Sequence, residues 1–250
     1  MSANLFKYTL RLGDNALILG HRLSEYCSNG PYLEEDISIT NTALDLLGQA
    51  EAFLKYAAQV EGKDRTEDDL AYKRPEHQFY NLQLTEQPNQ DFAHLQIRQF
   101  FMDAFNYYLY SELKNSKDLT LAAIAAKSLK EVTYHLRRSS EWMIRLGNGT
   151  QESKNRMQQA IDNLWQFTHE MFIADEVDEI LLKEEIAPDL STVKQSWDKK
   201  VTTILQQADL KQPEDSYQAT GSKKGYHTEY LGYILAEMQY LPRTYPDAKW

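Results

Sequence analysis

Apolar residues recur every three or four positions along four long stretches of this 250-residue chain, and a segment of 31 residues without that period separates the second stretch from the third. Such spacing places apolar side chains on one face of an α-helix. The four predicted helices cover residues 8–27, 34–60, 92–115 and 119–146. Short breaks join the first helix to the second and the third to the fourth, and residues 61–91 cross between the two hairpins. Two helical hairpins joined by a long crossover predict an all-α, ferritin-like four-helix bundle.

Further helical patterns follow the bundle and are interpreted as additional C-terminal helices. They cover residues 153–185, 192–207 and 228–240. Ten glycines and seven prolines are few for a chain of this length, which favours long uninterrupted elements. We predict one domain over residues 1–250, with a bundle core at about 8–146 and helical additions at about 150–250.

Composition narrows the classes of function. The formal net charge is −10 and the pI is about 5.1, which argues against binding nucleic acid or an anionic membrane. The sequence contains no apolar run long enough to span a bilayer and no secretory signal pattern. The single cysteine, Cys27, leaves no internal disulfide and no cysteine-rich metal site. We therefore expect a cytoplasmic protein.

Ferritin-like bundles often hold two irons, with one Glu from each of two helices and a Glu-x-x-His pair from each of the other two. The residues that best match this pattern are Asp14 on the first helix, Asp45 and Gly48 on the second, Asp103 on the third, and Glu131 and Tyr134 on the fourth. Three of the four carboxylates are the shorter Asp, and neither of the two i+3 positions is His. The pattern therefore predicts a degenerate metal site that binds no metal.

A polar cluster is expected to replace the metals, because an unpaired buried carboxylate is very costly. Lys127 and His135 are the candidate partners of the remnant carboxylates. The alternative is that some of these carboxylates face solvent. His135 follows Glu131 by four residues, a spacing that can also bind one metal, and His21 shares a helical stripe with Asp14.

Two other features point to partners. Lys223 and Lys224, beside two glycines, could contact a phosphate or the acidic groups of a partner, although a solvated loop is the simpler interpretation. Sixteen tyrosines exceed the needs of one core, and Tyr is enriched at protein interfaces. The sequence contains neither a glycine-rich phosphate loop nor a Gly-x-Ser-x-Gly motif.

Several segments resemble the C-type subunits of the bacterial multicomponent phenylacetyl-CoA epoxidases. They are YTLRLGDNALILGHRLSEYC, ALDLLGQAEAFLKYAA, QLTEQPNQDFAH, KEVTYHLRRSSEWMIRLGNGT and GSKKGYHTEYLGYILAEMQYLPR. The resemblance runs almost from end to end. It implies a ferritin-like subunit that has lost its di-iron ligands and has a structural role.

The same resemblance implies partners and cofactors held elsewhere in a hetero-oligomer. A related catalytic subunit would hold the di-iron centre and phenylacetyl-CoA, and a reductase with flavin and an iron–sulfur centre would supply electrons from NADPH. The complex would use O₂ to form the ring-1,2-epoxide in aerobic phenylacetate breakdown. This chain alone would then be no enzyme and would bind no cofactor.

Two alternatives stay open on the sequence. One is a self-sufficient di-metal oxidoreductase in which His135 and His21 replace the expected imidazoles. The other is a helical scaffold outside this pathway.

Overall fold

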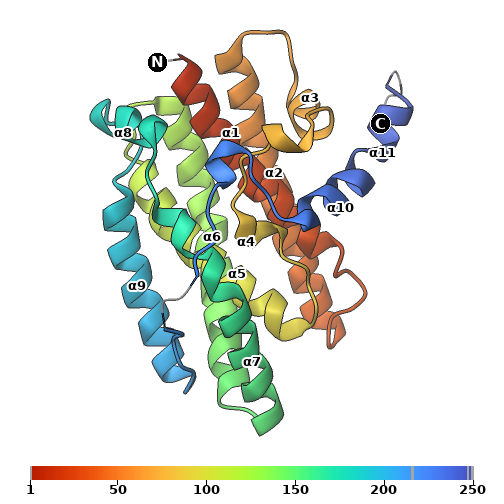
Figure 1. Cartoon of the computed structure of the whole chain (residues 1–250), viewed down its shortest axis with the longest axis vertical. Helices are drawn as coiled ribbons and strands as arrows, with labels where there is room; N and C mark the ends of the chain where they lie inside the picture. Colours follow the sequence, from red (N-terminus) through yellow and green to blue (C-terminus); the bar gives the residue numbers. More distant parts are fainter. Residues whose placement is uncertain (1, 215–216, 247, 249–250) are drawn as a thin grey trace. The chain divides into compact units, whose positions relative to one another are not determined.

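The protein is described by a computed structural model over residues 2–214, 217–246 and 248, and every regular element in these ranges is helical (Figure 1). The α-helices are α1 (Ser2–Ser24), α2 (Leu33–Glu61), α3 (Glu67–Tyr72), α4 (Gln83–Glu86), α5 (Phe92–Leu113), α6 (Leu119–Gly147), α7 (Gln151–Leu164), α8 (Glu176–Lys183), α9 (Leu190–Gln207), α10 (Glu229–Met238) and α11 (Tyr240–Thr244). The 3₁₀ turns are η1 (Glu76–Gln78), η2 (Trp165–Phe167), η3 (His169–Phe172) and η4 (Ser222–Lys224). The all-α prediction is confirmed, with two helical hairpins, a long crossover and additional C-terminal helices.

The chain forms two compact units. Unit 1 comprises Met1–Gln87 and Gly221–Trp250, and unit 2 comprises Pro88–Thr220. Each unit contains one of the two predicted hairpins. The assignment of the whole chain to one domain stays a prediction.

Unit 1 is built on the antiparallel pair α1 and α2 (Figure 1). Gly20 lies against Leu47 while Gly13, two turns earlier on α1, lies against Leu54, so the two helices run in opposite directions. A Cβ added to Gly13 would come within 2.7 Å of Leu54 Cδ2, which shows how closely the helices approach. Helix α10 adds Leu231 and its apolar neighbours to the same core.

The crossover starts where α2 ends at Gly62, whose φ of 67° is left-handed and whose N–H donates to the Ala58 carbonyl. Glycine adopts this conformation at little cost, which makes it a common helix terminator. A capping box between Thr66 and Asp69 then starts α3. The predicted crossover is therefore present, and α3, η1 and α4 give it regular structure.

Unit 2 is organised around α5, in which 17 of the 22 residues are buried. Helices α6, α7 and α9 pack against it (Figure 1). The Trp197 indole of α9 donates a hydrogen bond of 3.0 Å to the Phe101 carbonyl, and its ring lies 5.7 Å from the Phe101 ring. A helix whose sequence is apolar on every side belongs at the centre of a fold, and α5 occupies that place in its unit.

The predicted helix over residues 153–185 is interrupted. Helix α7 ends at Leu164, η2 and η3 follow, and α8 begins only at Glu176. The Thr168 hydroxyl donates to the Trp165 carbonyl within the turns, and Asp175 starts a new helix by forming a capping box with Asp178. The prediction was wrong here because local hydrogen bonds of Thr and Asp side chains compete with helix continuation. The predicted helix over 228–240 likewise divides at Gln239 into α10 and α11.

No helix within the described ranges is long and apolar enough to cross a membrane.

Candidate functional site

Asp103 is the centre of a buried polar cluster between α5 and α6. Its side chain accepts a hydrogen bond of 2.6 Å from Gln99 Nε2, one turn earlier on α5, and one of 2.8 Å from Ser139 Oγ on α6. Burial raises the pKa of Asp103 to about 6, against the opposing effects of His135, the two hydrogen bonds and Arg138. The carboxyl group is thus held by two neutral donors with basic side chains nearby. The predicted polar cluster gains a concrete form here, with Gln99, Ser139 and Arg138 as members that the sequence did not single out.

On α6, the candidate metal-site residues divide between a face that is buried in unit 2 and a face that is exposed to solvent. Glu131 is half-buried, and its charge adds to burial in raising the pKa of Tyr110 on α5. Tyr134, at i+3, is 50% exposed, whereas His135, at i+4, is 2% exposed. His135 is therefore the side chain that is buried on the same side of the helix as Glu131. Tyr134, at the i+3 position chosen from the sequence, faces solvent. Lys127 is exposed, and Asp103 takes its hydrogen bonds from Gln99 and Ser139 instead.

Asp14 on α1 is engaged by a cation. Its carboxylate forms an ion pair with Arg74, in which the side chains are 0% and 2% exposed. Arg74 Nη1 donates to Asp14 Oδ2 at 3.1 Å, and the Tyr80 N–H donates to the same oxygen at 2.9 Å. The guanidinium also lies 4.1 Å from the centre of the Phe79 ring. A carboxylate neutralised in this way does not suit a divalent metal, because the guanidinium already occupies its lone pairs.

Arg74 was not predicted as a partner from the sequence. It lies in the crossover, where no periodic pattern assigns a residue to the inside or the outside, so its pairing with Asp14 follows from tertiary structure alone.

The second-helix positions do not complete the di-iron pattern. Asp45 is half-buried on α2, and Gly48, where the pattern requires His, has no side chain and lies exposed. No atom lies within 4 Å of the place where a Cβ on Gly48 would stand. Among the residues that the structure describes, no group of three or more His, Cys, Asp or Glu side chains is arranged to hold a metal ion.

A second buried ion pair joins the crossover to the C-terminal part of unit 1. His227 Nδ1 lies 2.5 Å from Glu86 Oε1, and Nε2 lies 2.8 Å from the Phe79 carbonyl oxygen. Both partners are acceptors, so both ring nitrogens donate and the imidazole is protonated. Burial alone would lower the pKa of His227, but the Glu86 carboxylate, the Phe79 carbonyl and the charge of Asp14 raise it.

Glu86 has a full set of donors in this cluster. Its Oε2 accepts from the Thr228 N–H at 2.9 Å and from the Thr228 hydroxyl at 2.6 Å, and its Oε1 also accepts from Asn81 Nδ2 at 3.1 Å. These contacts fix the start of α10. The segment GYHTEYLG contributed only to the family resemblance, and this ion pair was not predicted from it.

The whole chain, residues 1–250, matches the phenylacetic acid catabolic protein family. It is also 51% identical over 246 residues to the C-type subunit of the 1,2-phenylacetyl-CoA epoxidase of Escherichia coli (strain K12), a match that covers 98% of this chain and 99% of the relative. The chain belongs to the phenylacetic acid catabolic protein family.

In this member of the phenylacetic acid catabolic family, Lys223 and Lys224 lie on η4. Gly221 and Gly225, with φ of 119° and 78°, bound the turn. A Cβ on Gly225 would collide with the His77 carbonyl oxygen, so the loop is fixed against η1. Lys224 is exposed and Lys223 is half-buried. A phosphate or interface contact by either lysine stays a prediction.

Proposed function

We propose that this chain is a structural, non-catalytic subunit of a multicomponent di-iron monooxygenase that converts phenylacetyl-CoA to its ring-1,2-epoxide with O₂ and NADPH. Its role is to support and shape a related catalytic subunit that holds the di-iron centre and the acyl-CoA. A reductase supplies the electrons. The proposal is supported by the 51% identity to an epoxidase subunit of Escherichia coli and by membership of the phenylacetic acid catabolic family. The cytoplasm stays the expected compartment.

The observation that carries the non-catalytic role is the buried Asp14–Arg74 pair. A di-iron centre needs carboxylates with free lone pairs and open positions for oxygen, and a guanidinium supplies neither. The other positions agree with this role. Gly48 offers no donor atom, Tyr134 faces solvent, and Asp103 is bound by Gln99 and Ser139.

One observation favours the alternative of a di-metal oxidoreductase with atypical ligands. His135 is buried near Asp103, and its electrostatic interaction with that carboxyl group opposes the effect of burial on the pKa of Asp103. A carboxylate and an imidazole at this place could bind one metal if both were deprotonated.

Turnover of the reconstituted complex separates the two candidates. Asp103→Asn and His135→Gln are expected to leave epoxidation within about twofold of the wild type, because neither side chain touches substrate or metal in the structural role. Loss of turnover in variants that still fold and assemble would contradict the non-catalytic role. Gln99→Glu, which adds a carboxylate beside Asp103, is the matched control for disturbing the cluster without removing a candidate ligand.

A further inference from the structure

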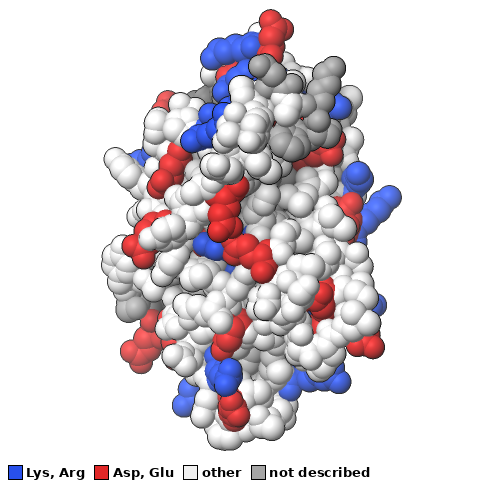
Figure 2. Space-filling model, turned by 90° about the vertical axis from the view of Figure 1, so that its right-hand side faces the viewer, with Lys and Arg blue, Asp and Glu red and all other residues white. Residues whose placement is uncertain are grey.

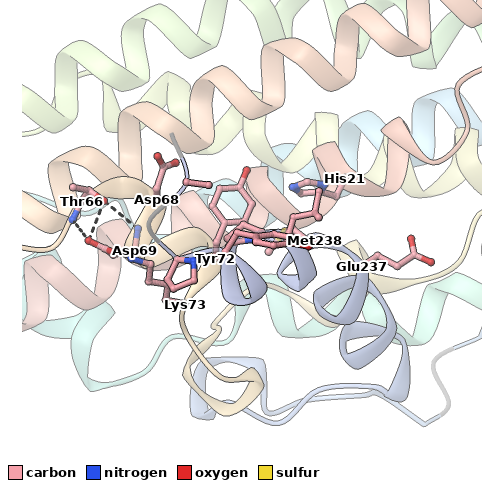
Figure 3. Close-up of a pocket in the computed structure, with 13 residues that line it drawn as sticks. His21, Thr66, Asp68, Asp69, Tyr72, Lys73, Glu237 and Met238 are labelled. Atoms are coloured by element: carbon pink, nitrogen blue, oxygen red, sulfur yellow. Dashed lines mark hydrogen bonds and ion pairs between the residues drawn. The ribbon is translucent and has the colours of Figure 1, made fainter. Parts of the chain in front are cut away.

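Two adjoining hollows lie on unit 1. The larger has a volume of about 690 Å³ and lies between the end of α1, α3 and the C-terminal helices (Figure 3). The smaller, of about 350 Å³, lies along α1, α2 and α3. Asp68 and Tyr72 line both hollows, so the two form one groove, which we call the α3 groove.

The floor of the α3 groove is apolar. Tyr72 stands in the middle, Met238 and Leu241 lie at one end, and Leu47 and Leu54 lie at the other. Figure 3 shows Tyr72 and Met238 near the centre of the larger hollow. Leu241 is 48% exposed, so part of this apolar surface is in contact with water.

The rim of the α3 groove is acidic. Among the described residues, five carboxylates line it, from Glu51, Glu67, Asp68, Asp69 and Glu237, against the ammonium of Lys73. Lys73 Nζ lies 2.6 Å from Asp69 Oδ1 and so neutralises one of the five. The remaining charge is negative over the length of the groove. In the view of Figure 2, red acidic side chains outnumber blue basic ones in the middle of the picture.

A polar group is left without a protein partner in the larger hollow. His21 Nε2 is buried and forms no hydrogen bond within the described residues. Figure 3 places the His21 ring beside Met238 in the hollow. The ring can therefore hydrogen-bond a group that enters from outside.

The outer face of α2 continues the apolar surface beyond the groove. Leu44, 60% exposed, precedes Leu47 and Gly48 by about one helical turn, and Ile37, 50% exposed, lies two turns before Leu44. Gly inside an exposed helix costs about 1 kcal/mol relative to Ala. The open backbone at Gly48 permits close approach by a partner.

We infer that the α3 groove docks a basic, apolar segment of another subunit of the phenylacetyl-CoA epoxidase complex. The inference rests on the proposed function. Charge complementarity selects this occupant, because an apolar floor attracts apolar side chains while an acidic rim favours Lys and Arg and rejects acidic segments. A second copy of this chain is disfavoured because each copy carries a net charge of −10 and the same acidic rim.

Charge reversal on the rim tests the docking. The groove variant is Glu51→Lys with Asp68→Lys, two exposed positions on α2 and α3. The matched control is Glu141→Lys with Asp162→Lys, also two exposed helical positions, on α6 and α7 of unit 2. Each purified chain is titrated with the remaining epoxidase subunits, and the dissociation constant is measured by sedimentation velocity. The groove variant is expected to bind at least tenfold more weakly than the wild type and the control to stay within twofold.

A third variant separates the apolar contribution from charge. Leu241→Ser is expected to weaken assembly several-fold at every salt concentration, whereas the defect of the groove variant should shrink as salt screens the rim. Thermal unfolding of each variant confirms that the fold is retained.

The outcomes distinguish this inference from the proposed function. A wild-type chain that binds none of the other subunits would contradict the proposed function itself. A wild-type chain that assembles, with a groove variant that assembles equally tightly, would overturn only the docking inference. Self-association of the wild type that the groove variant loses, with unchanged affinity for the other subunits, would assign the groove to a second copy and overturn the inference too.

Discussion

Buried charges in this chain are satisfied in three different ways. Asp14 is neutralised by Arg74, Glu86 pairs with a protonated His227, and Asp103 receives neutral hydrogen bonds from Gln99 and Ser139. A buried charge needs a partner because its desolvation is costly. Among the described residues, the first two carboxylates have a cation in direct contact, whereas the hydrogen bonds to the third come from neutral donors. Asp103 is therefore the carboxyl group whose protonation responds most to burial.

The raised pKa of Asp103 predicts a pH-dependent effect of Asp103→Asn. A carboxyl group whose folded pKa is about 6, against an ordinary 3.8, costs the folded state little below pH 3.8, an increasing amount between pH 3.8 and about 6, and a constant amount above that. Asn removes that cost while keeping a polar side chain. The stability advantage of the variant over the wild type is expected to be about 1–2 kcal/mol larger at pH 8 than at pH 5. Chemical denaturation at both pH values measures this difference.

The control for that experiment is Asp45→Asn, which replaces a half-buried carboxylate on α2 and should shift stability by a similar small amount at both pH values. A large loss of stability in Asp103→Asn at pH 8 would show that the charge of Asp103 is needed by His135 or Arg138.

At the scale of elements, periodicity predicted the hairpin helices because each buries one face against its neighbour. Helix α5 has apolar residues on every side, and 17 of its residues are buried. The break between α7 and α8 was missed because it depends on Thr168 and Asp175, whose side chains bond to local backbone groups. Helix boundaries of this kind depend on a few side-chain hydrogen bonds to the backbone. The periodic spacing of apolar residues carries no information about those bonds.

The sequence predicted several residues of the candidate site, but it did not predict most of the contacts that these residues make. Asp103 was chosen as the carboxylate of the third predicted helix and His135 from its i+4 spacing to Glu131, and the structure places both in one buried cluster. Arg74, Glu86 and His227 come from segments without a regular period, so their buried faces follow only from how the crossover folds back. Tyr134 shows a limit of spacing as well, because a shift of one residue on a helix turns a side chain by about 100°.

The ion pair between His227 and Glu86 predicts how firmly α10 is attached to the crossover. Because the folded pKa of His227 is raised above 6.5, its stabilising contribution is complete below pH 6.5 and declines as pH rises through the folded pKa. His227→Gln is expected to destabilise the chain by about 3 kcal/mol near pH 6, because it leaves Glu86 buried without its cation. The difference from the wild type should shrink by pH 9.

Urea denaturation at pH 6 and pH 9 measures that prediction. His77→Gln, at an exposed histidine of the same unit, is the matched control and should change little. Equal destabilisation by His227→Gln at both pH values would contradict a stabilising role for the imidazolium, and the lost stability would then be attributed to packing alone.

At the scale of the whole molecule, the chain has a ferritin-like helical fold, and its described residues contain no group of three or more His, Cys, Asp or Glu side chains arranged to hold a metal ion. The predicted carboxylate positions divide between the two units, with Asp14 and Asp45 in unit 1 and Asp103 and Glu131 in unit 2. In unit 1 a guanidinium binds Asp14, and in unit 2 neutral donors bind Asp103. Exposed apolar side chains and the acidic α3 groove agree with a chain that functions by assembling with others.

Iron content of the purified chain tests the non-catalytic role most directly. The chain is incubated with ferrous iron without oxygen, desalted, and analysed by mass spectrometry for iron per protein, with the complete epoxidase complex as the positive control. The non-catalytic role predicts far less than one iron per chain. Two irons per chain, lost on His135→Gln, would contradict it and establish a di-metal centre with atypical ligands.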